Sequence, residues 1–136
     1  MVQPLIDEAE IRRRYARLTA GEQMPDLLAE DIVINQSAEI PGTAGTFQGL
    51  EGVRAMQDEL AEGLSDLVWK PDRIEQLDDG RWLILLRVSG QGTSSGVPTE
   101  TQVGHLARYD EQGRLKRLDV HGEWDEARHA AAEDSW

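Results

Sequence analysis

The chain has 136 residues, a length typical of one domain, and we expect residues 1–136 to form that domain. Its 26 acidic and 14 basic side chains give a net charge of −12, which would repel nucleic acid and anionic lipid surfaces. The absence of cysteine excludes disulfides and thiol chemistry. No apolar run approaches about 18 residues and no signal peptide opens the chain. We therefore expect a cytoplasmic protein that binds neither nucleic acid nor a membrane.

Two helices are expected in the first half of the chain. Residues 7–20 carry apolar side chains at helical spacing and acids in the first turns, and Gly21 follows as a stop. Residues 50–64 show one apolar stripe, made of Leu50, Val53, Met56, Leu60 and Leu64. A short helical turn, a strand and a loop connect the two helices, over residues 25–30, 31–36 and 37–49.

The second half of the chain predicts a β-sheet followed by a short helix. Turn residues separate four strand-like segments, which are 67–77, 81–91, 99–109 and 114–122. Residues 125–134 then predict a short helix. Helices first and a strand meander afterwards indicate an α+β fold, a curved antiparallel sheet with helices on one face.

The facing of the later strands depends on the register of two hairpins. The loop 111–113 ends in Gly113, which a three-residue hairpin usually holds in a left-handed bulge, and this pairs His105 with Asp119. Centring the preceding loop near Ser95 then puts an apolar set on the helix side, namely Trp82, Ile84, Leu86, Val88, Leu106, Leu118 and Val120. A mixed set falls on the opposite side, namely Leu83, Leu85, Arg87, Ser89, Thr101, Val103, His105, Arg117, Asp119 and His121. A slip of one residue would invert this assignment.

Six segments in this order carry a family resemblance: "RRRYARLTAGE", "LLAEDIVINQ", "GTFQGLEGVRAM", "LLRVSGQGTSSG", "GHLARYDEQGRLKRLDVH" and the closing "DEA". Together they resemble the SnoaL-like branch of the nuclear-transport-factor-2-like (NTF2-like) superfamily, over about residues 7–130. The resemblance implies a cone-shaped α+β barrel with a pocket between the helices and the concave sheet. It also implies a homodimer through the convex face. It does not fix the function, because the fold hosts cyclases, isomerases, epoxide hydrolases, dehydratases and binding domains.

The positions that carry chemistry in these enzymes hold other residue types here. Polyketide cyclases and limonene epoxide hydrolases place an aspartate on the last strand, and the matching residue is Val120. The tyrosine and asparagine of the epoxide hydrolases match Ile34 and Gln36. Ketosteroid isomerase uses an aspartate base and a protonated aspartate, and we find no matching pair. Since valine cannot move a proton, we expect no catalytic acid or base at position 120.

A ligand pocket in such a cone would be mostly apolar, with a few orienting polar groups. We predict that it is lined by Tyr15, Gln36, Met56, Trp69, Leu86, Val88, Gln102, Leu118 and Val120. Gln36 and Gln102 could orient a ligand through their amides, and exposure at the cone mouth is an equal alternative for both. For Tyr15, Met56 and Trp69 the alternative is a place in the core.

A polar cluster is predicted on the opposite, subunit-facing side of the sheet, formed by Arg87, His105, Asp119 and His121. Two chemical alternatives involve the same side chains. His105, Asp119 and His121 could hold a metal as two imidazoles and a carboxylate, or His105 and Asp119 could form an acid–base dyad. Both would lie away from the cavity, so we expect neither a metal nor another cofactor.

The sequence therefore predicts a homodimeric SnoaL-like protein that binds a small, neutral, hydrophobic molecule without a cofactor. One alternative is an enzyme of the same fold, of the cyclase, isomerase or hydrolase type, which would use Tyr15, Gln36 or His105. Another is a dimeric interaction domain whose cone is filled by its own side chains. A titratable side chain that reaches the cavity would favour the enzyme over the plain binding protein.

Overall fold

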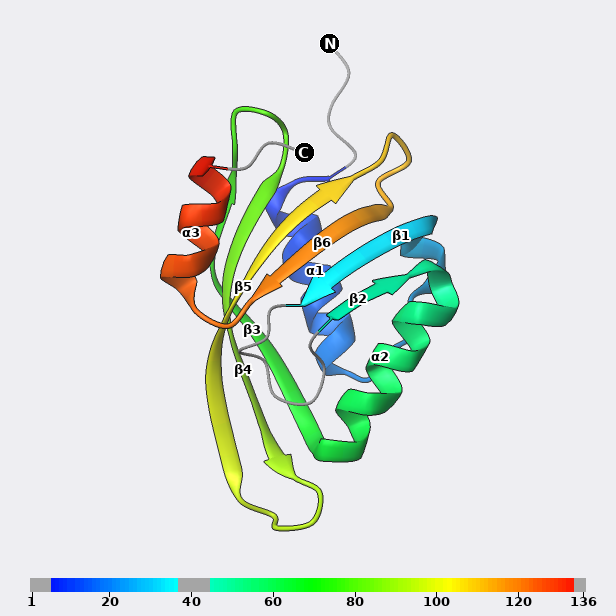
Figure 1. Cartoon of the computed structure of the whole chain (residues 1–136), viewed down its shortest axis with the longest axis vertical. Coiled ribbons are helices and arrows are strands. Elements are labelled where there is room, and N and C mark those ends of the chain that lie inside the picture. The colour runs from blue at the N-terminus through cyan, green and yellow to red at the C-terminus, as the bar shows by residue number, and fades with distance from the viewer. Residues whose placement is uncertain (1–5, 37–44, 134–136) are drawn as a thin grey trace.

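The computed structural model describes residues 6–36 and 45–133 (Figure 1). Their elements follow in the order α1 (Glu8–Thr19), a 3-10 turn (Pro25–Leu27), β1 (Leu28–Gln36), β2 (Gly45–Gln48), α2 (Gly49–Gly63), β3 (Leu64–Gln76), β4 (Trp82–Gly92), β5 (Pro98–Tyr109), β6 (Leu115–His121) and α3 (Trp124–Glu133). The three predicted helices and the four later strands are present, each within a few residues of its expected bounds.

Local sequence signals explain where the first helix begins and ends. The Asp7 carboxylate accepts a hydrogen bond from the backbone N–H of Glu10 at 2.8 Å, which caps the first turn of α1. Gly21 follows the helix with a φ of 83°, a left-handed backbone that glycine adopts without strain. Ile11 is fully buried on the face of α1 that packs against the sheet.

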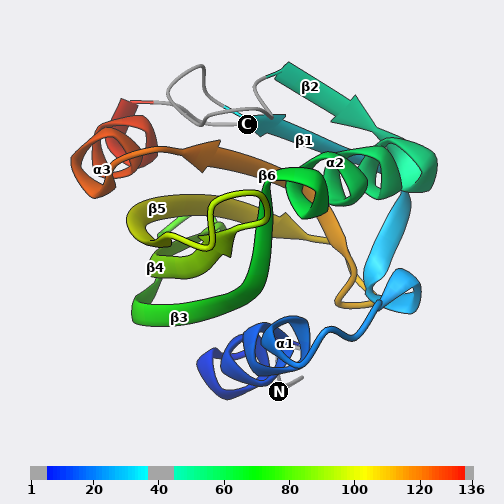
Figure 2. The ribbon, with the colours of Figure 1, turned by 90° about the horizontal axis from the view of Figure 1, so that it is seen from below.

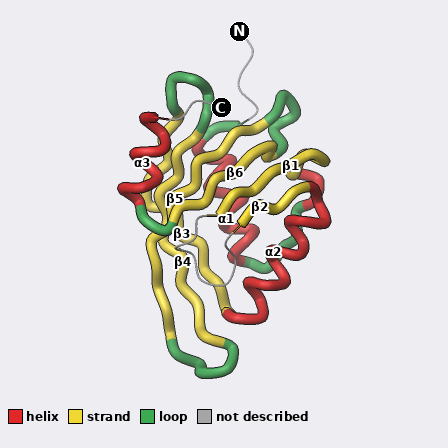
Figure 3. The backbone as a smooth tube through the Cα atoms, in the orientation of Figure 1, coloured by secondary structure: helices red, strands yellow, loops and turns green. Residues whose placement is uncertain are grey.

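The six strands form one mixed sheet in the order β2-β1-β6-β5-β4-β3 (Figure 3). β1 and β6 run parallel, whereas every other neighbouring pair is antiparallel, so the sheet is not antiparallel throughout as predicted. β1 starts at Leu28, inside the segment predicted to be a helical turn. β2 lies in the segment predicted to be a loop, whose residues 37–44 are outside the described residues.

Helices cover both faces of the sheet, although the sequence predicted them on one face only. Figure 2 shows α2 and α3 on opposite sides of the sheet, with α1 beside β3. We call the face toward α1 and α2 the inner face, and its apolar cluster includes Ile11 and Val53 of these helices. We call the face toward α3 the outer face, where a second cluster joins Leu83, Leu85, Leu106 and Ala127.

α3 comes close to the sheet because β5 has a glycine beneath it. A Cβ added at Gly104 would overlap the side chain of Ala127, so the two small residues allow the backbones to approach. The Trp124 indole N–H also donates to the backbone carbonyl of Leu86 at 2.9 Å. Pro71, the residue of β3 that pairs with Leu86, has no backbone N–H and so cannot donate a hydrogen bond to that carbonyl.

The register between β5 and β6 differs from the prediction by one residue. The turn is as expected, since Gly113 has a φ of 77° and Tyr109 pairs with Leu115. A β-bulge at Lys116 then adds one residue to β6 before the pairing resumes. As a result His105 lies opposite Val120 rather than opposite Asp119.

The hairpin between β4 and β5 is also shifted by one residue. Ile84 pairs with His105, so the two residues lie on the same face of the sheet, whereas the predicted register placed them on opposite faces. The two shifts cancel for β4 and β6, whose apolar residues face the helix pair as expected. β5 alone is reversed. The prediction was therefore wrong for Thr101, Val103 and His105, which belong to the inner face, and for Leu106, which belongs to the outer face.

Candidate functional site

The inner face carries a row of side chains that crosses four strands. Paired residues place Gln36 of β1, Val120 of β6, His105 of β5 and Ile84 of β4 side by side. Strands in a sheet lie about 4.8 Å apart. Val120 lies between Gln36 and His105, which are therefore two strand spacings from each other. Val120, His105 and Ile84 are 7%, 5% and 0% exposed.

Tyr15 of α1 meets His105 from above the sheet. The Tyr15 hydroxyl and His105 Nδ1 form a hydrogen bond of 2.5 Å, and the two rings stack with their centroids 5.8 Å apart. The Trp69 ring of β3 lies next to the same imidazole, at 6.3 Å between centroids. Two aromatic side chains, from α1 and β3, thus lie against the imidazole.

Burial keeps this pair uncharged. Burial, together with the electrostatic effect of His121, lowers the pKa of His105 from its ordinary 6.5 to about 3. Burial, helped by neighbouring Tyr109, raises the pKa of Tyr15 well above its ordinary value. A neutral phenol and a neutral imidazole are therefore the forms present near neutral pH.

The second ring nitrogen of His105, Nε2, has no hydrogen-bond partner among residues 6–36 and 45–133. When the Tyr15 hydroxyl donates to Nδ1, the neutral imidazole carries its proton on Nε2. Its neighbours on the adjacent strands, Val120 and Ile84, are apolar. The arrangement offers one uncharged N–H donor inside an apolar environment.

Eight of the nine predicted pocket residues lie on the inner side of the sheet. Val120, Leu118, Leu86 and Val88 belong to the inner cluster, and Tyr15, Met56 and Trp69 pack against it. The Gln36 amide donates to the Met56 sulfur at 2.8 Å. Gln102 is the exception, because it pairs with Arg87 and is exposed on the outer face. That part of the prediction was wrong for the same reason as His105: the register of β5.

The predicted polar cluster loses its central member. His105 points to the inner face, whereas Arg87, Asp119 and His121 remain on the outer face. The two faces of a sheet point in opposite directions, so neither the two-histidine metal site nor the His105–Asp119 dyad can form. Within the part of the chain that the structure describes, no group of three or more acidic or histidine side chains is arranged to hold a metal.

The three remaining outer-face side chains bind partners within the chain. Arg87 stacks on the Trp124 ring at 5.4 Å, and His121 Nδ1 lies 3.2 Å from a carboxylate oxygen of Glu126, so both contact α3. Asp119 accepts hydrogen bonds from Asn35 at 2.9 Å and from Arg117 at 3.3 Å. Their polar groups are therefore used to hold elements together.

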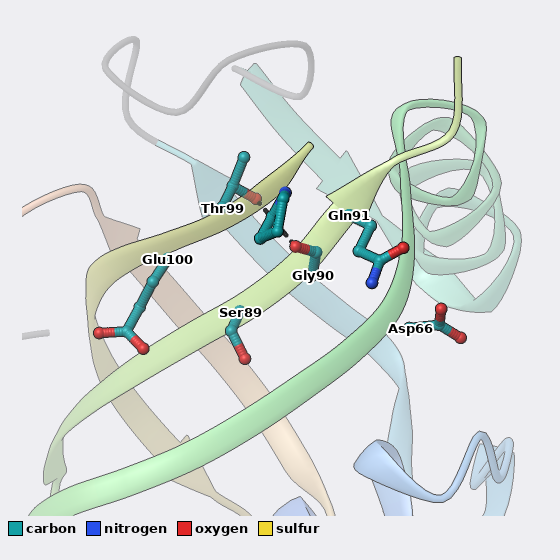
Figure 4. Close-up of a pocket in the computed structure, with 7 residues that line it drawn as sticks. Asp66, Ser89, Gly90, Gln91, Thr99 and Glu100 are labelled. Carbon is teal, nitrogen blue, oxygen red and sulfur yellow. Dashed lines mark hydrogen bonds between the residues drawn. The ribbon is translucent and has the colours of Figure 1, made fainter. Parts of the chain in front are cut away.

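Two hollows on the surface lie away from this row. One of about 360 Å³ opens at the far end of β3, β4 and β5, where Figure 4 shows Asp66, Gln91 and Glu100 around it. The other, of about 340 Å³, lies between α3 and the sheet beside Leu77, Leu83 and Arg128. Neither hollow is lined by Tyr15, His105 or any other residue of the predicted pocket.

Sequence reasoning named Tyr15 and His105 separately but missed that they meet. The available signal was the strand 99–109 itself, in which His105 alternates with Val103 and Ala107 as a residue of the apolar face does. Thr19, whose hydroxyl hydrogen-bonds the backbone of Trp69, was not among the predicted site residues. Its hydroxyl donates a hydrogen bond to a residue 50 positions later in the sequence, and the sequence pattern around Thr19 gives no sign of this contact.

Comparison with solved structures identifies the architecture. A protein of unknown function from Burkholderia pseudomallei K96243, described as NTF2-like, superposes with a TM-score of 0.63 at 20% identity, over 90% of this chain and 88% of that one. TerC, crystallised with polyporic acid, superposes with a TM-score of 0.70 at 15% identity, over 93% and 97% of the two chains. The chain has the NTF2-like fold.

The NTF2-like fold is also that of SalBIII, an epoxide hydrolase/cyclase-like enzyme of pyran ring formation in the polyether salinomycin. SalBIII superposes with a TM-score of 0.67 at 12% identity, over 85% of this chain and 89% of that one. At these identities the likeness concerns the fold alone. No family model matches the sequence, and no curated protein matches it significantly. None of the described helices has the length and apolar character needed to cross a bilayer.

Proposed function

We propose that this NTF2-like chain binds a small, uncharged, largely apolar molecule between α1, α2 and the inner face of the sheet. The polar group of that molecule would meet Nε2 of His105. The observation that carries the proposal is the buried Tyr15–His105 pair, which leaves one uncharged nitrogen without a partner among apolar side chains. Sites for small molecules are typically of this kind, apolar with a few fixed polar groups.

The charge of the site favours a neutral ligand. No ionised side chain belongs to the inner cluster of the described residues, and the chain as a whole carries a net charge of −12. An anion would meet the field of the acidic surface, and Arg14, which lies over the Tyr109 ring, is already paired with Glu10. TerC, which shares the fold, was co-crystallised with polyporic acid, and this supports a small organic molecule as the class of ligand.

A second candidate function is a cofactor-independent isomerase, cyclase or hydrolase. The observation that favours it is the same His105, because a titratable side chain reaches the inner face. Its pKa of about 3 makes it a weak base, and Val120 beside it supplies no carboxylate. In such an enzyme the pair would act as a neutral hydrogen-bond donor that polarises a carbonyl group of the substrate.

We also propose that the chain forms a homodimer through the outer face of the sheet, opposite the ligand site. α3 covers β4, β5 and β6 on the outer face, so a homodimer would use the part of this face that α3 leaves open. That part includes Asn35, Thr46 and Asp119, which are joined by hydrogen bonds across β2, β1 and β6. Sedimentation of the wild-type chain would test it, and a monomer at all concentrations would contradict a homodimer.

The binding proposal is tested first by native mass spectrometry of gently purified protein and then by NMR of histidine ring nitrogens. Acetophenone, a neutral acceptor, should shift the Nε2 signal of His105, while benzoate, its anionic analogue of similar size, should not. The signal of exposed His129 is the internal control. No retained molecule and no selective shift of His105 with acetophenone would contradict the proposed function and favour a cone filled by its own side chains.

A further inference from the structure

We propose that Thr19 is a positioning residue, which sets α1 on β3 so that the Tyr15 hydroxyl meets His105. This inference rests on the proposed function, because it gives Thr19 a part in presenting Nε2 to a ligand. Thr19 belongs to the last turn of α1, and Trp69 belongs to β3, the last strand on that side of the sheet. Figure 2 shows α1 alongside this strand.

The Thr19 hydroxyl satisfies both backbone groups of one residue. It accepts a hydrogen bond from the Trp69 N–H at 2.8 Å and lies 3.3 Å from the Trp69 carbonyl oxygen, to which it donates. A second bond from the same helix reaches the same strand, since Arg12 Nη1 donates to the carbonyl of Pro71 at 3.4 Å. The side chains of α1 thus form hydrogen bonds with backbone groups at the free edge of β3, where a neighbouring strand would otherwise pair.

Tyr15 lies between these two contacts on the same face of the helix. Residues 12, 15 and 19 are three and four positions apart, which places them above one another along α1. Because Thr19 and Arg12 hold the helix at both ends of this face, Tyr15 has a fixed height over the sheet. The residue that Thr19 holds, Trp69, is also the ring that packs against His105.

The Thr19 bond therefore acts on both neighbours of the imidazole at once. It orients the backbone of Trp69, and it sets the position of Tyr15 one helical turn earlier. If α1 turned or slid by a fraction of a turn, the hydroxyl of Tyr15 would leave Nδ1, and the proton of the neutral imidazole would no longer be held on Nε2. Thr19 itself has no contact with His105, so its influence is indirect.

The experiment compares Thr19→Val, which keeps the shape but removes the hydroxyl, with Thr19→Ser, which keeps the hydroxyl. Ring-nitrogen NMR of the ligand-free protein is the first readout. We expect one tautomer of His105 in the wild type and in Thr19→Ser, and a mixture of both tautomers in Thr19→Val. Thr99→Val is the matched control, because it removes a threonine hydroxyl bonded to a strand carbonyl far from His105.

Acetophenone affinity is the second readout, and we expect it to fall about tenfold in Thr19→Val, the loss of one well-oriented hydrogen bond. Thr19→Ser should restore it. An unchanged tautomer in folded Thr19→Val overturns the positioning role, whether or not any ligand binds. A wild type with one fixed tautomer that binds no neutral probe overturns the proposed function instead, so the two failures are distinct.

Discussion

Asp119 and Val120 are neighbours in β6, yet they lie in two different chemical environments. Asp119 faces outward and accepts hydrogen bonds from Asn35 and Arg117, so its charge is compensated by side chains of the same sheet. Val120 faces inward among apolar residues, beside a histidine that burial keeps neutral. On the outer face these polar groups join β6 to β1 and to α3, whereas on the inner face Nε2 of His105 has no hydrogen-bond partner among the described residues. This difference locates the candidate site.

The largest effect should come from placing a charge on the inner face. Val120→Asp would bury a carboxylate in the apolar row, and we expect the free energy of unfolding to fall by about 4 kcal/mol at neutral pH. Denaturant titration measures this loss. Val120→Asn places a polar but uncharged side chain at the same position, so it shows how much of the loss is due to charge. Val33→Asp places the same charge on the outer face, at a half-buried position of β1. Equal losses for Val120→Asp and Val33→Asp would remove the contrast between the two faces.

The contact between Gly104 and Ala127 tests the outer face. Gly104→Ala places a methyl group where the side chain of Ala127 lies, so α3 must shift away from β5. We expect a loss of about 2 kcal/mol in unfolding free energy, the usual range for overpacking. Gly63→Ala is the control, because a methyl group there meets nothing within 4 Å. If both variants unfold at the same denaturant concentration, α3 does not pack closely on this face.

The pH dependence of stability tests the neutral state of His105. The unfolded chain binds a proton on this imidazole near pH 6.5, whereas the folded chain binds it only near pH 3. Between these values the unfolded state holds more protons, so the free energy of unfolding rises with pH, by at most about 1.4 kcal/mol per unit. Thermal and denaturant unfolding between about pH 5 and 6.5 avoids the carboxylates, which titrate lower.

His105→Gln should flatten this slope, and His129→Gln should leave it unchanged, because His129 is exposed on α3. The neighbours of His105 on the inner side, Tyr15 and Trp69, are uncharged over the whole interval. A slope that persists in full in His105→Gln would mean that another group causes it and that burial does not lower the pKa of His105.

The smallest effect is expected for the hydroxyl of Tyr15. Tyr15→Phe keeps the ring on the inner cluster and removes the hydrogen bond to His105, so unfolding free energy should fall by about 1 kcal/mol. Tyr109→Phe is the matched control, because the ring of Tyr109 contacts Arg14 rather than His105. If Tyr15→Phe also leaves the His105 ring-nitrogen signals unchanged, the hydrogen bond does not select the tautomer.

Local pattern predicted most of the fold but failed at two register shifts. The helix over residues 7–20 has a cap, an apolar stripe and a glycine stop, and each signal lies within its own segment. The bulge at Lys116 leaves no such signal, because lysine occurs in regular strands as well. One extra residue is enough to turn β5 over, and with it His105, Gln102 and Leu106.

The candidate site was predicted in part for the same reason. Tyr15, Trp69 and Val120 follow from helical and strand periodicity within their own elements, and they are on the side expected. The meeting of Tyr15 with His105, 90 residues apart, depends on the register of β5 and on the height of α1 over the sheet. The position of α3 was not predicted, because Gly104 allows close packing only with Ala127 of α3, a contact between two elements that the local sequence pattern does not show.

The bonds of Thr19 and Arg12 to β3 have a consequence for the solubility of the chain. β3 is an edge strand of 13 residues, and a strand of this length with open backbone groups would pair with strands of other molecules. α1 occupies the backbone groups of Trp69 and the carbonyl of Pro71, while proline itself offers no donor. The first helix thereby protects this part of the sheet edge from pairing with a strand of another molecule.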